Sequence, residues 1–166
     1  MQIAAQKITP CLWFDTEAEE AARFYCSVFR DSRLGKISRY LNEGQEIHGK
    51  EAGSVMAVEF EITGLKFTGL NVGPQFKFTE AVSFQVHCED QKEVDYFWEK
   101  LSEGGSEGPC GWLKDKFGLS WQVVPKVLFT MLSSGDQKKS ERVTKAFLQM
   151  KKFDIAELER AYAGAR

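Results

Sequence analysis

The chain has little histidine, and its cysteines are scattered. Among 166 residues there are two histidines, His48 and His87, and four cysteines, with no C-x-x-C pair and no zinc-ligand spacing. A site that needs several imidazole ligands is therefore excluded by count. We expect reduced thiols that act as small hydrophobic side chains or pocket walls. These are Cys11, Cys26, Cys88 and Cys110.

The chain also lacks a basic excess and a long apolar run. Its 22 Lys and Arg residues against 24 Asp and Glu give a net charge of −2, so we expect no nucleic-acid partner. Residues 1–14 contain no apolar stretch long enough for a signal peptide or a membrane span, which predicts a cytoplasmic protein with no membrane partner. A hydrophobic fraction of 43% and a charged fraction of 28% are typical of a globular domain.

The first half predicts one helix among several strands. Residues 8–14 alternate as a strand, and the next segment has helical apolar spacing, with Thr16 and Glu19 as a capping box at its start. Further strands are predicted at 35–41, 54–62 and 65–73. The polar stretch 42–53, which contains His48, is predicted to be a flexible loop, with a mobile lid as the alternative.

The pattern then restarts in a more compact form. Residues 81–89 alternate as a strand, and a helix follows with Asp90 and Glu93 as capping box and Gly104–Gly105 as its stop. Its Phe97–Trp98 pair is predicted to pack on the sheet. Residues 111–125 form a hairpin whose charged turn at 114–116 is predicted to be solvated.

The two halves therefore indicate an internal duplication. A first unit at 1–80 and a second at 81–125 each contain a strand, a helix and further strands. Together they could bury a common core and leave a cleft, so we predict one structural domain overall. Residues 126–166 change to amphipathic helices with Asp154 and Glu157 as a third capping box. This tail is predicted to be a packed surface element, or else to dock on a second subunit.

Several motifs resemble a known family. The segments "FDTEAEEAARFY", "GPQFKF", "CGWLKDKFGLSWQVVP" and "LQMKKFDIAELERAYAG" are similar to the PhnB-like family of the vicinal oxygen chelate superfamily. This superfamily includes glyoxalase I, and the family often carries the label 3-demethylubiquinone-9 3-methyltransferase. The resemblance implies an α+β fold of two β-α-β-β-β units that form curved mixed sheets, with C-terminal helices. It also implies a cavity and commonly a homodimer.

Catalytic members of the superfamily hold a divalent metal with residues of the first and last strand of each unit. The resemblance implies that the corresponding positions in this chain are Thr9, Asn71, Ser83 and Gln122. None of these side chains is ionised or an imidazole. Neutral hydroxyls and amides do not hold a catalytic transition metal alone, so we predict no metal and no other cofactor, although a divalent metal stays possible. The glycine-rich run 102–111 follows a helix and precedes a strand, which does not suit S-adenosylmethionine and argues against methyl transfer.

Strand alternation predicts a cavity for a small organic ligand. Small polar groups with an aromatic side chain on a concave sheet suit such a ligand, and the alternative is a filled interior whose polar groups bond one another. In the hairpin, Leu119, Trp121 and Val123 should face the helices, and Val124 should lie on the cavity side. The predicted cavity residues are Thr9, Cys11, Trp13, Asn71, Ser83, Gln85, His87, Ser120 and Gln122.

Three functions stay open at this point. The first is a binding protein for a small organic molecule, without a metal centre of the conserved type. The second is an enzyme that works without a metal or with weak metal dependence, with His87 as acid or base and Cys11 as a candidate nucleophile. The third is a purely structural dimer or regulatory partner.

Overall fold

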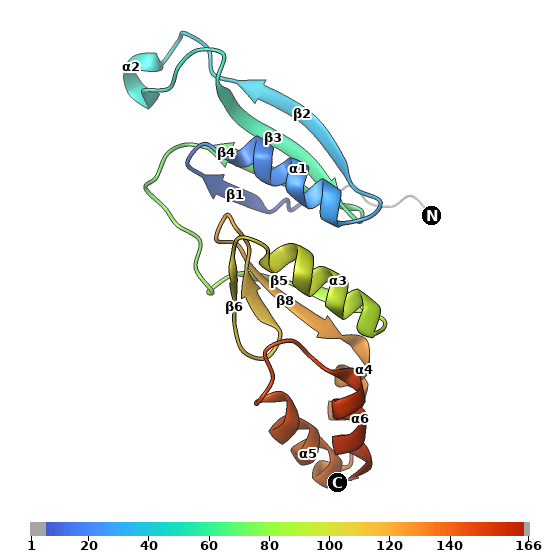
Figure 1. Ribbon diagram of the computed structural model, residues 1–166. Coiled ribbons are helices and arrows are strands. Elements are labelled where there is room, and N and C mark those ends of the chain that lie inside the picture. The colour runs from blue at the N-terminus through green and yellow to red at the C-terminus, as the bar shows by residue number, and fades with distance from the viewer. Residues whose placement is uncertain (1–5, 165–166) are drawn as a thin grey trace. The chain divides into compact units, whose positions relative to one another are not determined.

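The computed structural model describes residues 6–164 (Figure 1). The prediction of no signal peptide in residues 1–14 concerns a stretch that lies partly outside this range. The chain divides between Lys77 and Phe78 into two compact units, and each is described by itself. No helix within the described residues is both long enough and apolar enough to cross a bilayer.

The described part of the first unit contains a four-stranded sheet in the order β1-β4-β3-β2, with β1 parallel to β4 and the other pairs antiparallel. Helix α1 lies along one face of it (Figure 1). The predicted loop at 42–53 contains a single helical turn, α2. The elements are β1 (Cys11–Phe14), α1 (Ala18–Val28), β2 (Arg33–Arg39), α2 (Gln45–His48), β3 (Val55–Ile62) and β4 (Leu65–Asn71).

Aromatic stacking and a distant cap fix α1 on this sheet. Tyr25 of α1 stacks on Phe60 of β3, with ring centroids 5.9 Å apart. The capping box predicted from Thr16 is wrong, because the helix begins at Ala18 without a side-chain cap from its own start. Instead, the backbone N–H of Ala18 donates to Asn71 Oδ1 at the end of β4, at 2.8 Å. An amide remote in sequence thus satisfies a donor that the helix leaves free.

The described part of the second unit contains a sheet with the same topology, in the order β5-β8-β7-β6. The strand β5 runs parallel to β8, as β1 does to β4, which confirms the predicted duplication. The Asp90 cap of α3 is confirmed, since its side chain accepts from the Glu93 N–H. The glycine-rich run contributes a short strand. The elements are β5 (Ser83–Cys88), α3 (Gln91–Ser102), β6 (Ser106–Glu107), β7 (Trp112–Lys114) and β8 (Ser120–Pro125).

The C-terminal helices belong to the second unit and dock on a turn of it. They are α4 (Lys126–Leu132), α5 (Gln137–Phe147) and α6 (Ile155–Ala163). The segment between α5 and α6 carries the buried Phe153 and Met150, whose carbonyl accepts from the Cys110 N–H at 2.8 Å. Gln91 of α3 donates to the Phe153 carbonyl and accepts from the Ile155 N–H. The tail is thus bonded into the unit at several backbone positions.

The charged turn of the hairpin is not fully solvated as predicted. Asp115 is 2% exposed, and its Oδ1 accepts from the N–H groups of Phe117 and Leu119. An aspartate that bonds backbone two residues onward shapes the turn itself. The prediction of a solvated turn therefore fails at the central residue of 114–116, which is structural.

Candidate functional site: the open face of the second sheet

The sheet of the second unit has one face against α3 and one turned away from it. Val86 and Cys88 are buried on the α3 side, while Gln85 and His87 are exposed on the other. In the parallel pairing of β5 with β8, Gln85 lies beside Gln122. The predicted alternation along β5 is confirmed. We call the face turned away from α3 the open face.

A row of polar side chains crosses the open face. Gln122 Nε2 donates to Ser83 Oγ at 2.8 Å, and Gln85 Nε2 donates to Gln122 Oε1 at 3.2 Å. The structure thus brings three of the predicted cavity residues together. Because Gln122 also pairs with Trp112 of β7, this row adjoins an indole that the sequence-based prediction did not include.

A pocket of about 430 Å³ lies next to this row. Ser120 is fully buried in its wall, and its Oγ has no hydrogen-bond partner within the described part of the chain. A buried hydroxyl normally has a partner, so an unpaired one in a pocket wall marks a place for a ligand or water. The lining residues are Glu80, Ser106, Glu107, Gly108, Pro109, Trp112, Leu113, Lys114 and Ser120.

Two charged residues form an ion pair in this pocket. Lys114 Nζ lies 2.7 Å from Glu80 Oε1, with side-chain exposures of 34% and 63% respectively. The hydrogen bond from Lys114 holds the pKa of the Glu80 carboxyl below its usual range. Glu107 of the same wall is bound elsewhere, because its Oε1 accepts from the Trp98 indole at 2.9 Å. The pocket therefore contains one lysine whose counter-ion is a largely exposed carboxylate.

Sequence reasoning missed Trp112, Lys114 and Glu80. The signal was present in the alternation, because Trp112 and Lys114 are two residues apart and pair with Gln122 and Ser120. Alternation places both side chains on one face of β7, but only the register set by the turn at Asp115 makes this the open face. No local pattern marks Glu80, which precedes β5 and reaches Lys114 through the tertiary fold.

His87 lies at another part of the open face. It pairs with Val124, its side chain is exposed, and its ring lies 5.4 Å from that of Phe129 on α4. The next residue, Cys88, is buried on the α3 side, and burial raises its pKa to about 12. Cys88 is therefore not a nucleophile at neutral pH.

The predicted residues of the first strand lie in the first unit. Thr9 lines a separate pocket of about 440 Å³ that also contains Glu59 and Lys66. Trp13 donates through Nε1 to the Gly73 carbonyl at 2.7 Å, so its polar atom already has a partner. Cys11 is exposed, but desolvation raises the pKa of its thiol, which disfavours the nucleophilic thiolate.

The expected place of Asn71 needs correction. In the parallel pairing of β1 with β4, Asn71 lies beside Phe14, on the side of α1, and is buried there. Its Oδ1 caps α1, and its Nδ2 donates to the Val55 carbonyl at 3.1 Å. Thr68 lies beside Cys11, as Gln122 lies beside Gln85. The prediction shifted the equivalent position by three residues, because it matched the prolines that follow the two strands.

The four positions carried over from metal-binding relatives do not fit a metal. Asn71 uses its amide to bond backbone, and Thr68, which holds the equivalent position instead, is a neutral hydroxyl. Gln122 uses both ends of its amide within the row of Ser83 and Gln85. The donors are neutral, whereas such metals take imidazole, thiolate or carboxylate ligands. Within residues 6–164 no group of three or more His, Cys, Asp or Glu side chains is arranged to hold a metal ion.

Comparison with known proteins gives a consistent family and fold. The family model described as 3-demethylubiquinone-9 3-methyltransferase matches residues 6–124. The solved PhnB protein from Bacillus cereus, which carries the same description, is 36% identical, covers 72% of this chain and 99% of its own, and has a TM-score of 0.62. A comparison with functionally curated proteins finds no match.

More distant structures share the fold. The protein PA1353 from Pseudomonas aeruginosa is 18% identical, with a TM-score of 0.57 and coverage of 73% of this chain and 98% of that one. The fosfomycin resistance protein FosX from Mesorhizobium loti is 14% identical, with a TM-score of 0.50 and coverage of 72% and 90%. The family model ends at residue 124, so helices α4 to α6 lie beyond it.

Proposed function

Because the chain belongs to the 3-demethylubiquinone-9 3-methyltransferase family and has the fold of the vicinal oxygen chelate superfamily, we propose that it binds a small organic molecule in the pocket of its second unit. One observation carries the proposal. Ser120 is fully buried in the pocket wall, and its Oγ has no partner among residues 6–164. A ligand that bonds this hydroxyl removes the cost of leaving it unpaired.

The composition of the pocket supports the same function. Ligand sites are mostly apolar clefts of roughly 300–1,000 Å³ with a few placed polar groups. This pocket, at about 430 Å³, offers the Trp112 indole and Pro109 as apolar surface, with Ser120 and Lys114 as polar groups. Asn71, Ser83 and Gln122 are bonded to other protein groups, and Thr9 is neutral, so we propose binding without a metal of the conserved type. Protein purified without an affinity tag should contain far less than one equivalent of Zn, Ni, Mn or Fe by elemental analysis.

Methyl transfer is not part of the proposal, although the family description names it. The glycine-rich run at 102–111 forms the end of α3, the strand β6 and the turn into β7. It does not follow a strand or open a helix, as a nucleotide-binding turn does. The proposed activity is therefore recognition of a ligand.

An enzyme is the alternative, and the place of His87 favours it. The exposed imidazole shares the open face with Gln85 and lies beside the Phe129 ring. It could act as acid or base on a substrate that extends from the pocket to this edge. Loss of turnover in His87→Ala with ligand binding intact would establish the enzyme, and intact binding without turnover in either protein supports the binding function.

A thermal-shift screen of a fragment library tests the proposal on the full chain. Ligands stabilise the folded state according to their concentration relative to Kd. Hits on the wild type should lose their shift in Trp112→Ala and Ser120→Ala. They should keep it in Tyr96→Ala, which truncates an exposed aromatic side chain on α3. Hits that shift all four proteins equally would refute binding in this pocket.

The last point concerns the cellular location and the oligomeric state of the protein. We propose a cytoplasmic homodimer, and the free state of the four cysteines, which all lie within residues 6–164, supports a reducing location. Light scattering at micromolar concentration should give twice the chain mass of 18.8 kDa. The mass of a monomer would refute the proposed dimer and would leave the proposed ligand binding unaffected.

A further inference from the structure

We propose that the ligand of the second-unit pocket is an aromatic carboxylate, whose carboxylate replaces Glu80 on Lys114 while its ring packs on Trp112. This inference rests on the proposed function, because it assigns a chemical class to the same pocket. It is supported by the arrangement of three groups: the Lys114 ammonium, its present partner Glu80 and the Trp112 indole.

The cation and the unpaired hydroxyl are neighbours. Lys114 and Ser120 are paired residues of the antiparallel strands β7 and β8, and both line the pocket. Directly opposed residues of such a pair have side chains on the same face, with Cβ atoms about 4.5–5.5 Å apart. A carboxylate has two oxygens, so one can accept from the Lys114 ammonium and the other from the Ser120 hydroxyl. No described residue bonds that hydroxyl, which leaves it free for this role.

Glu80 marks the place of the ligand's carboxylate. Its Oε1 lies 2.7 Å from Lys114 Nζ, and its side chain is 63% exposed. It sits in the segment before β5, outside the regular strands. An ion pair this exposed contributes little to stability, so an incoming anion exchanges with Glu80 at small cost. Glu80 returns to solvent, and Lys114 keeps a carboxylate partner throughout.

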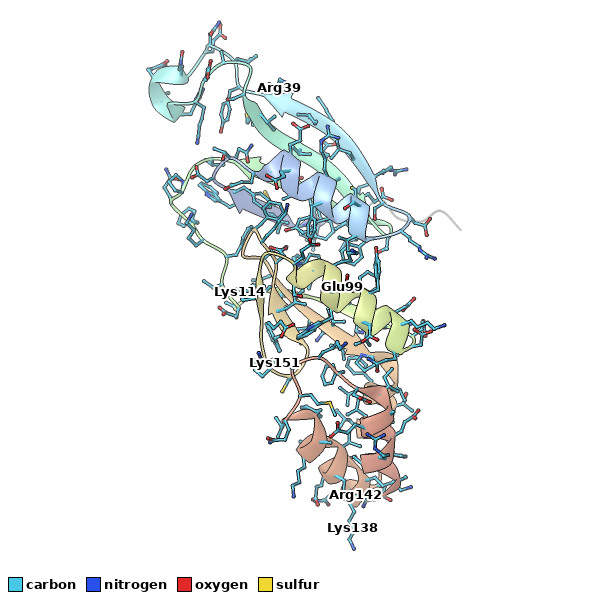
Figure 2. All side chains as sticks on the ribbon, in the orientation of Figure 1. Arg39, Glu99, Lys114, Lys138, Arg142 and Lys151 are labelled. Carbon is cyan, nitrogen blue, oxygen red and sulfur yellow. The ribbon has the colours of Figure 1, made fainter. Side chains whose placement is uncertain are left out.

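The opposite exchange, in which a cationic ligand displaces Lys114, is disfavoured by the same contacts. Lys114 belongs to a strand and is the less exposed member of the pair, at 34%. The other carboxylate of the wall, Glu107, accepts from the Trp98 indole and lies 3.8 Å from Lys151 Nζ. Figure 2 labels both Lys114 and Lys151 on this unit. The group that leaves most readily is therefore the carboxylate of Glu80.

The position of Trp112 indicates an aromatic ring in the ligand and limits the distance between this ring and the ligand's carboxylate. It is half-buried, lines the pocket and stands two residues before Lys114, so both side chains lie on one face. Two residues along a strand span about 6.6 Å. This distance suits a ring with the carboxylate attached directly or through one carbon. Gly108 lies directly beside Trp112 in this wall, because its N–H donates to the Trp112 carbonyl at 2.8 Å.

The test uses three probes that differ in one property each. Phenylacetate has the ring and the charge, phenylacetamide has the ring without the charge, and cyclohexylacetate has the charge without the aromatic ring. Calorimetric titration of the full chain gives the affinities. The indole N–H signal of Trp112, assigned with Trp112→Phe, reports the place of binding. Phenylacetate should bind most tightly and shift this signal.

Two variants address the exchange at Lys114. Glu80→Gln removes the competing carboxylate and should tighten phenylacetate binding roughly two- to fivefold, in keeping with the small worth of an exposed pair. Lys114→Met removes the cation and should weaken it at least about tenfold. The matched controls are Glu99→Gln and Lys100→Met, which alter another exposed ion pair of this unit, on α3, and should leave affinity unchanged. Glu99 is labelled on α3 in Figure 2.

The outcomes separate the two proposals. If phenylacetamide binds as well as phenylacetate and shifts the Trp112 signal, the pocket binds ligands but the aromatic acid is wrong. Weaker phenylacetate binding to Glu80→Gln than to the wild type would also overturn the exchange, even if Lys114→Met fails to fold. If neither these probes nor any library fragment shifts the Trp112 signal, the proposed function falls as well.

Discussion

Asp115 Oδ2 accepts a hydrogen bond from the Trp121 indole Nε1 at 2.8 Å, with both side chains buried. The other carboxylate oxygen holds two backbone N–H groups of the turn between β7 and β8. This carboxylate joins the turn to the core of the second unit and fixes the register in which Lys114 meets Ser120.

Replacing Asp115 should therefore cost more than replacing an ordinary capping residue. Asp115→Ala leaves an indole and two backbone donors without their partner, and we expect a loss of about 3 kcal/mol in the free energy of unfolding. Urea denaturation measures it. Asp136→Ala, which removes an exposed cap of α5, is the matched control and should cost only about 1 kcal/mol. Equal losses would mean that burial of Asp115 adds nothing.

Asn71 should behave as a structural residue of the first unit. Asn71→Ala removes the cap of Ala18 and the donor to Val55, so we expect about 2–3 kcal/mol of destabilisation with ligand affinity of the second-unit pocket unchanged. Asn42→Ala, in the exposed loop before α2, should change stability by less than about 0.5 kcal/mol. Loss of ligand binding at full stability in Asn71→Ala would restore Asn71 as a site residue.

Gly111 should not tolerate a side chain. Its φ is +81°, and a Cβ there would lie 2.4 Å from the Phe153 ring and 2.7 Å from the Val123 carbonyl oxygen. We expect Gly111→Ala to cost about 3 kcal/mol or more. Gly118→Ala has a similar φ of +85° with nothing within 4 Å, so it isolates the backbone strain and should cost about 1 kcal/mol.

A double variant locates the clash of Gly111→Ala. Adding Phe153→Ala should recover part of its cost, because one of the two colliding groups is gone, and the double-variant cycle gives the coupling energy. Strict additivity of the two changes would show that Phe153 does not press on this turn.

Cys88 should resist modification until the chain unfolds. Burial, with smaller contributions from the charges of Glu93 and Asp90, raises its pKa to about 12 from an ordinary value of 9.0. A thiol-disulfide reagent at pH 8 should modify the exposed Cys11 first and Cys88 only with global unfolding. Mass spectrometry of the labelled peptides distinguishes the two, and rapid labelling of Cys88 in the native protein would contradict its buried place.

The same shift has a consequence at alkaline pH. Between pH 9 and 12 the unfolded thiol loses its proton while the folded one keeps it, so the unfolded state binds fewer protons and stability falls as pH rises. Cys88→Ala should flatten this part of the stability profile. An unchanged alkaline slope in the variant would refute the assignment.

Predictions from sequence succeeded where a structure depends on near neighbours. The Asp90 cap lies three residues from its donor, and the face of Gln85 follows from simple alternation. They failed where a partner came from elsewhere in the chain. The start of α1 is capped by Asn71 and not by Thr16, and nothing in the local pattern shows that β4 ends beside that helix.

Only some residues in and beside the pocket were predicted from the sequence, for a related reason. Ser120 and Gln122 follow from alternation along β8, but Lys114 was assigned to a solvated turn. The turn begins one residue later, at Asp115, whose buried carboxylate cannot be told from a surface charge by composition. The register of β7, and with it Trp112, follows only when this carboxylate is known to point inward.

The contact of Phe153 with Gly111 also sets an order of events during synthesis. Domains fold as units, beginning at the N-terminus, while the ribosome is still adding residues. The first unit contains the partners of its own sheet by Asn71, so it is able to fold early. The second unit has all the strands of its sheet by Pro125, yet the turn at Gly111 and the start of α3 wait for Met150, Phe153 and Ile155 to leave the ribosome. Until then the turn at Gly111 lacks the Phe153 ring that packs against it, so we expect the second unit to complete its fold only after synthesis of its last helix begins.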